Sequence, residues 1–167
     1  MRHSLDLLLD ASGDAAVRAE WRLLSEAGLP SSGDRQDATH GPHVTLAERD
    51  EVPAEAERAV GTLVASLPLA LHLGPPVVLG TADRWFLARS VVPSAALLAL
   101  HAEAAELLGP GGPPWAAPGA WLPHVTLSRR LTTTALTEAL GLLGPAYDVA
   151  ATRLRRWDPE ARTVRDL

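Results

Sequence analysis

The chain has 167 residues, of which 47% are hydrophobic, and a formal net charge of −5. This size and composition predict one domain with a core of its own, and the absence of Cys excludes disulfides, thiolate metal sites and a Cys nucleophile. No apolar run approaches the roughly 18 residues of a membrane span, and the N-terminus has no signal-peptide pattern, so we expect a cytoplasmic protein without membrane contact.

The first part of the chain predicts alternating strands and helices. Leu5, Leu7 and Leu9 alternate in residues 2–10 as on a strand. A helix of about residues 14–27 should follow and end at Gly28. The string PHVTL at residues 42–46 predicts the next strand. After it we expect a helix opened by Pro53 and carrying Val60, Leu63, Val64 and Leu67 to the core, then strands near 69–80 and 84–92.

The same order resumes in the second part. Pro93 should open a helix, and the sequence GPGGPPWAAPG then breaks the chain, which places an internal boundary near 109–120. A second PHVTL at residues 123–127 predicts another strand. The remaining elements that we expect are a helix over 133–143 with a Thr cap, a strand near 147–157, a turn at DPEA and a last strand at 161–166.

The repeated PHVTL is the strongest signal in the sequence. The two copies lie 81 residues apart, which is too long for a solenoid repeat and fits an internally duplicated domain. We therefore predict a single α+β domain spanning 1–167. It should be bilobal and pseudo-twofold, each lobe an antiparallel or mixed sheet backed by helices, with an active-site cleft between the sheets.

Each repeat carries the pattern His-x-Thr. On a strand, alternate side chains share a face, so His43 lies beside Thr45 and His124 beside Thr126. Two such pairs across a pseudo-twofold cleft could hold one phosphate. The Thr hydroxyls would bind nonbridging oxygens, and the two imidazoles would act as acid and base in an in-line displacement.

Other candidate residues have weaker support. His40 and His43 form H-x-x-H, but three positions apart on a strand they should point to opposite faces, so we expect no metal site and no cofactor. His3, His72 and His101 are expected at the surface or core edge. Three aromatic residues could stack on a base, with core packing as the alternative: Trp85, Trp115 and Trp121. Arg153 and Arg155, which share a strand face with Trp157, could contact phosphate, with a solvated sheet face as the alternative. Residues 109–120 could form a lid or only the joint between lobes.

Two h-P-H-h-T-L motifs about eighty residues apart resemble the 2H phosphoesterase superfamily, most closely the bacterial 2'-5' RNA ligase or RNA 2',3'-cyclic phosphodiesterase (LigT-like) family. The resemblance covers nearly the whole chain. It implies metal-independent chemistry with His43 as general acid and His124 as general base, and with Thr45 and Thr126 holding the phosphate. Arg129 stands where the family often continues the second motif as H-x-T-L-x-R, whereas Glu48 replaces a residue that is usually apolar or aromatic.

We therefore expect a monomeric phosphodiesterase that hydrolyses the 2',3'-cyclic phosphate of a nucleotide or RNA end. Its site residues would be His43 and His124 for catalysis, and Thr45, Thr126, Arg129 and Trp121 for substrate binding. The alternatives are a 2'-5' RNA ligase or 2'-5' oligonucleotide phosphodiesterase, and a non-catalytic nucleotide or phosphate-binding module. The net charge of −5 argues against long duplex nucleic acid, while the 7 Arg against 5 acids in residues 121–167 fit a small or terminal phosphate.

Overall fold

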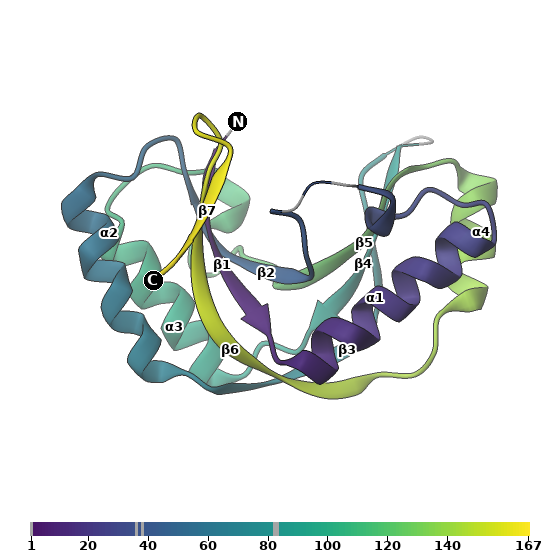
Figure 1. The fold of residues 1–167 in the computed structure, drawn as a ribbon, viewed down its shortest axis with the longest axis horizontal. Coiled ribbons are helices and arrows are strands. Elements are labelled where there is room, and N and C mark those ends of the chain that lie inside the picture. Colours follow the sequence, from purple (N-terminus) through teal and green to yellow (C-terminus); the bar gives the residue numbers. More distant parts are fainter. Residues whose placement is uncertain (1, 36, 38, 82–83) are drawn as a thin grey trace.

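A computed structural model describes residues 2–35, 37, 39–81 and 84–167. Its four α-helices and seven strands confirm the α+β class (Figure 1). The helices are α1 Ala11–Glu26, α2 Ala54–Val60, α3 Ala95–Leu107 and α4 Thr133–Leu142. The strands are β1 His3–Leu9, β2 His43–Arg49, β3 Leu69–Leu79, β4 Trp85–Val91, β5 His124–Leu131, β6 Tyr147–Asp158 and β7 Thr163–Asp166.

Local capping explains where the helices start. Asp10 accepts a hydrogen bond from the Gly13 amide at the start of α1, and Ser94 and Thr132 do the same for α3 and α4. The helix opened at Pro53 is shorter than its apolar pattern predicts. It changes to a 3-10 helix over Gly61–Ser66, which turns Val64 to the surface.

The strands form one antiparallel sheet in the order β2-β1-β6-β3-β4-β5, with β7 paired to β6. Exchanging β2 with β5, β1 with β4 and β6 with β3 gives the same order read from the other end. The duplication expected from the sequence therefore appears in the topology. The two halves share a continuous sheet, because β6 and β3 pair at its centre. The sheet curves into an open bowl, and the motif strands at its two ends lie side by side (Figure 1).

Helices from each half of the chain cover the strands of the other half. The helix α1 follows β1 but packs with α4 near β5, and α3 follows β4 but packs with α2 near β2 (Figure 1). Neither lobe is therefore one continuous half of the sequence. Because of this exchange, the two lobes share one cluster of buried side chains, which includes Leu7, Val17, Leu73 and Leu127.

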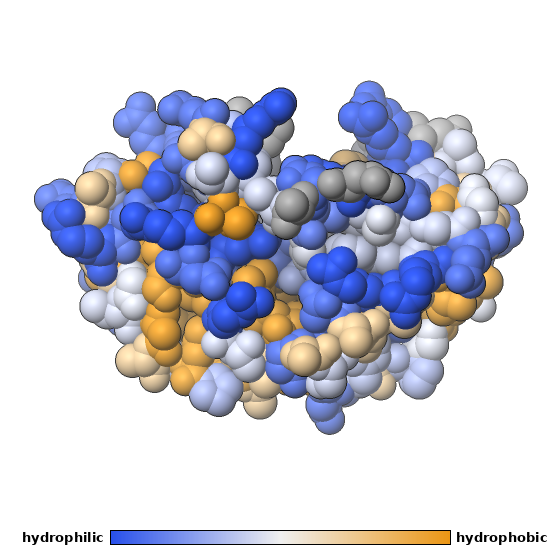
Figure 2. Space-filling view, viewed as in Figure 1, coloured by the Kyte–Doolittle hydropathy of each residue, from blue (hydrophilic) through white to orange (hydrophobic). Residues whose placement is uncertain are grey.

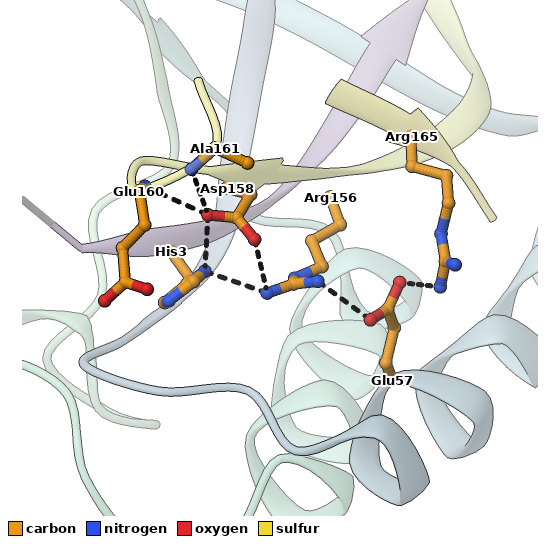
Figure 3. A network of polar contacts seen from close by, with 7 residues as sticks. All are labelled: His3, Glu57, Arg156, Asp158, Glu160, Ala161 and Arg165. Atoms are coloured by element: carbon orange, nitrogen blue, oxygen red, sulfur yellow. Dashed lines mark hydrogen bonds and ion pairs between the residues drawn. The ribbon is translucent and has the colours of Figure 1, made fainter. Parts of the chain in front are cut away.

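Charged side chains fasten the C-terminal hairpin of β6 and β7 to α2 and β1 (Figure 3). Arg156 on β6 donates hydrogen bonds to Glu57 on α2, to Asp158 and to the Nδ1 atom of His3, at 2.9, 3.2 and 3.0 Å. Arg165 on β7 forms an ion pair with the other oxygen of Glu57. His3 is thus buried within a polar network, whereas from the sequence we expected it at the surface or core edge.

None of the helices in the described part of the chain is long and apolar enough to cross a membrane.

Candidate active site

The two motif strands present matching residues to the open side of the sheet. In β2 and β5 alike, the His and Thr of the motif are half-buried, while Val44 and Val125 between them are buried in the core. This is the alternation that the sequence predicts for His-x-Thr on a strand. Since β2 and β5 lie side by side, the structure brings both motifs to the centre of the molecule.

Both motif histidines are oriented by the same local hydrogen bond. The Nδ1 atom of His43 lies 2.7 Å from the carbonyl oxygen of Gly41, and Nδ1 of His124 lies 2.8 Å from that of Leu122. A carbonyl oxygen only accepts, so Nδ1 carries the proton in each ring. The Nε2 atom of each ring is left to exchange a proton with a ligand, as an acid when protonated and as a base when neutral.

A β-bulge follows each motif at the equivalent position. Along the pairing with β1 the register skips Leu46, and along the pairing with β4 it skips Leu127. An extra residue reverses the alternation of a strand. Glu48 and Arg129, each five residues after a motif His, are therefore brought to the open face with the motif residues, whereas strict alternation would have turned both to the core.

A cavity of about 220 Å³ opens beside the first motif. Figure 2 shows a hollow at the upper edge of the molecule, between two hydrophilic shoulders. The cavity is lined by β1, β2 and β6 on one side and by the segment before β2 on the other, with Arg129 contributed by β5. Its lining residues are Arg2, Ser4, Asp6, Arg35, Asp37, Thr39, His40, His43, Thr45, Glu48, Arg129, Arg155 and Trp157. His124 and Thr126 are not among them.

Polar partners hold Thr45 within the cavity. Its hydroxyl lies 3.4 Å from one oxygen of Asp6, and Arg155 donates to the other oxygen at 3.3 Å. Arg155 also donates to the carbonyl oxygen of Thr39 at 3.0 Å. Because 3.4 Å is long for such a bond, the Thr45 hydroxyl can turn to a phosphate oxygen, and Arg155 neutralises the carboxylate behind it.

His40 lines the same cavity as His43, which corrects the prediction that the two rings point apart. The reason is that β2 begins only at His43, so His40 lies in the preceding turn and not on a strand. Its ring stacks on Trp21 at 5.1 Å and its Nε2 lies 2.9 Å from the carbonyl oxygen of Ser32. Burial, followed by the charges of Arg35, His43 and Arg129, lowers the pKa of His40 to about 4.

Arg129 provides positive charge to the cavity, and within the described part of the chain its guanidinium forms no hydrogen bond or ion pair. Its guanidinium lies 5.8 Å from the ring centre of Phe86. Burial and then the neighbouring Arg35 lower the pKa of Arg129, while Glu48 raises it. Among the described residues, no group of three or more His, Cys, Asp or Glu side chains is placed to hold a metal ion.

Two tryptophans support the motif strands from beneath. Trp121 donates through Nε1 to the carbonyl oxygen of Thr45 at 3.1 Å, and Trp21 donates to that of Thr126 at 3.0 Å. Each indole therefore holds the Thr of the motif in the other half of the chain. Trp121 also stacks on His101 at 4.1 Å. This His is fully buried and bonded to the carbonyl oxygen of Leu46, whereas from the sequence we expected it at the surface or core edge. The sequence did not reveal the contacts of Trp21 and His101 with the motif strands, since a single aromatic residue on a helix gives no sign of its partner.

The other candidates lie apart from this cavity. Trp85 packs against the core and donates to the Thr133 hydroxyl, Trp115 is exposed beside Arg2, and Arg153 pairs with Asp166. Arg49 on β2 donates to the carbonyl oxygen of Gly109, at the start of residues 109–120, at 3.0 Å, and to that of Ala105 on α3 at 2.9 Å.

Comparisons with known proteins match the sequence to a family and the fold to solved structures. The model of the 2'-5' RNA ligase superfamily matches residues 12–163. The structure of E. coli LigT complexed with 3'-AMP is similar at 20% identity, with a TM-score of 0.55, over 99% of this chain and 92% of that one. Kluyveromyces marxianus Usb1 with uridine monophosphate is similar at 12% identity, with a TM-score of 0.53, over 99% and 95%. No curated protein matches the sequence.

Proposed function

Since the chain belongs to the 2'-5' RNA ligase superfamily, we propose that it is a phosphodiesterase that hydrolyses the 2',3'-cyclic phosphate of a nucleotide or RNA end. The observation that carries the proposal is the matched pair of imidazoles, each with Nδ1 bonded to a backbone carbonyl and Nε2 left to react. Binding a phosphate needs donors only, whereas two imidazoles in the same tautomer suit an acid and a base.

The reaction divides between the two motifs. Nε2 of neutral His124 removes a proton from water as the water oxygen attacks phosphorus. The bond from phosphorus to one ribose oxygen breaks, and that oxygen takes the proton from Nε2 of protonated His43. The product is a nucleoside 2'- or 3'-monophosphate, and proton exchange with solvent restores both rings. This assignment of acid and base follows the family resemblance.

The substrate contacts come from three more residues. The hydroxyls of Thr45 and Thr126 donate to nonbridging phosphate oxygens, and Arg129 stabilises the charge that develops on them. Trp121, which the sequence placed with the substrate-binding residues, acts in this proposal through its hydrogen bond to the Thr45 carbonyl. The known ligands of the structural relatives support a small nucleotide, since their structures contain 3'-AMP, ATP and uridine monophosphate.

Turnover of nucleoside 2',3'-cyclic monophosphates in EDTA tests the proposal. We expect the wild type to release a monophosphate with a bell-shaped pH dependence. His43→Ala and His124→Ala should each lower kcat by about 10²–10⁴-fold, the contribution of an acid or a base. His72→Ala is the matched control, because His72 pairs with Asp148 outside the cavity. Loss of activity on chelation, or near-normal rates in either motif variant, would contradict the proposal.

The superfamily name itself favours a second candidate, a 2'-5' phosphodiester linkage as substrate. The same four motif residues would serve ligation or cleavage. Incubating the wild type with a 2'-5' and a 3'-5' dinucleotide distinguishes this candidate, which requires cleavage of the 2'-5' isomer alone. Nucleotide binding without turnover of either class would indicate a binding module. The monomeric state that we propose predicts a molar mass near 17.7 kDa by light scattering.

A further inference from the structure

Two rows of side chains cross the cavity floor, and they differ in how their polar groups are occupied. One row contains Thr45, Asp6 and Arg155, which are aligned on β2, β1 and β6. These three bind one another and leave Asp6 no free oxygen. In the proposed function the Thr45 hydroxyl of this row turns to the phosphate, so the row belongs to the phosphate end of the site.

The neighbouring row contains Glu48, Ser4 and Trp157, aligned on the same three strands. All three line the cavity and are half-buried. Among the described residues, no partner bonds to the Glu48 carboxylate, the Ser4 hydroxyl or the Trp157 indole N–H. Polar groups in a cavity normally find a partner, so this row is available to a bound molecule.

The row has the shape and chemistry of a site for a nucleobase. Adjacent strands lie about 4.8 Å apart, so the small Ser4 leaves a slot between a carboxylate and an indole two strands away. Proteins commonly hold an unpaired base by stacking it on an aromatic ring and reading its Watson–Crick edge with polar groups. Glu48 lies three residues beyond Thr45, which a bulged strand covers in about 7–10 Å, so a ribose can span from phosphate to base.

We infer that Glu48, Ser4 and Trp157 form a base-recognition subsite that selects guanine. This inference rests on the proposed function, since it assigns the base of the same nucleotide substrate. A carboxylate only accepts hydrogen bonds. Guanine presents N1–H and the N2 amino group side by side, and the two donors match the two oxygens of Glu48. Adenine and cytosine offer one amino donor beside a ring acceptor, and uracil flanks its single N–H with two carbonyl oxygens that face the carboxylate unfavourably.

Equilibrium binding tests the subsite independently of catalysis. Isothermal titration calorimetry of the wild type with guanosine, adenosine, cytidine and uridine 3'-monophosphates should give the lowest Kd for the guanosine nucleotide. We expect roughly a tenfold or greater preference over uridine, as for one bidentate contact. Glu48→Gln should remove this preference, because an amide supplies one donor and one acceptor. Trp157→Ala should weaken all four nucleotides by a similar factor.

The control is Glu51→Gln, which changes a carboxylate outside the cavity and should leave all four Kd values unchanged. Equal Kd values for the four nucleotides in the wild type, or a preference that persists in Glu48→Gln, would overturn the inference. If no cyclic phosphate is hydrolysed but the guanosine preference appears, the proposed function fails while the subsite stands. If turnover occurs without the preference, only the subsite fails.

Discussion

At the scale of single residues, His40 and His43 line one cavity, but their imidazoles lie in different surroundings. Its ring is covered by Trp21 and its Nε2 is held by the Ser32 carbonyl, whereas Nε2 of His43 is left to react. Because the pKa of His40 is lowered to about 4, its ring stays neutral beside Arg35 and Arg129. It therefore packs under the site without adding a third positive charge near them.

The depressed pKa predicts that His40 destabilises the fold in acid. Between pH 6.5 and about 4 the unfolded chain protonates this His and the folded chain does not. The unfolded state then binds more protons than the folded state. The contribution of neutral His40 to the free energy of unfolding is therefore fully present above pH 6.5 and is lost as the pH falls towards 4. We expect a loss on the order of 1–2 kcal/mol, less than the full shift because the ring is only half-buried.

Urea unfolding at pH 7 and pH 5 measures this loss. His40→Phe keeps an aromatic ring for Trp21 and removes the titrating group. The free energy of unfolding of the variant should fall less between the two pH values than that of the wild type. An equal fall in both proteins would show that His40 does not cause the acid sensitivity.

At the scale of elements, the crossed indole bonds predict matched effects in the two motifs. Trp21→Phe and Trp121→Phe each keep an aromatic ring but remove the N–H that the carbonyl of Thr126 or Thr45 accepts from. An unpaired, partly buried carbonyl costs about 1–3 kcal/mol. We expect each variant to lose an amount of this order in urea unfolding followed by circular dichroism.

Trp115→Phe is the matched control for this pair. Trp115 is exposed, and a Phe ring can still form the cation–π contact with the Arg2 guanidinium. The free energy of unfolding of this variant should therefore stay within about 0.5 kcal/mol of the wild type. If all three variants lost the same free energy of unfolding, the indole hydrogen bonds would contribute nothing, and Trp21 and Trp121 would support the motif strands by apolar packing alone.

The elements also show what the sequence could predict. Strand alternation, Pro positions and caps predicted the strands and helices close to their observed bounds. Alternation also predicted that the His and Thr of each motif share one face of their strand. The bulges at Leu46 and Leu127 could not be read, because a pattern of period two gives no sign of an extra residue. Strict alternation would turn Glu48 to the core, and the sequence indicated no role for it in the site, so its place in the cavity had to come from the structure.

At the scale of the whole molecule, a buried ion pair joins the exchanged helix α1 to the sheet of the other half. Arg89 on β4 is fully buried and donates to one oxygen of Glu20 on α1, through Nε at 2.9 Å and also through a second nitrogen. Arg89 further donates to the carbonyl oxygens of Gly74 and Gly144 at 3.2 and 2.7 Å. The hydroxyl of Tyr147 contacts the other Glu20 oxygen at 3.3 Å.

This pair follows from the exchange of helices and could not be predicted from either residue. Glu20 and Arg89 are 69 positions apart, and a lone acid on a helix or a lone Arg on a strand normally faces solvent. Only the packing of α1 against α4 and β5, beside β4, brings them together. The duplicated topology thus creates a buried charge pair that fixes how the two lobes join.

Removing both partners should therefore cost less than the sum of removing each one alone. Arg89→Met leaves the Glu20 carboxylate buried and unpaired, and it strips two carbonyl oxygens of their donor. We expect a loss of about 3–5 kcal/mol in the free energy of unfolding, measured with urea. In the double variant Glu20→Leu, Arg89→Met no unpaired charge remains, so the loss should be clearly smaller than the sum of the two single losses. Purely additive losses would mean that the pair is not coupled and that apolar packing alone joins the lobes.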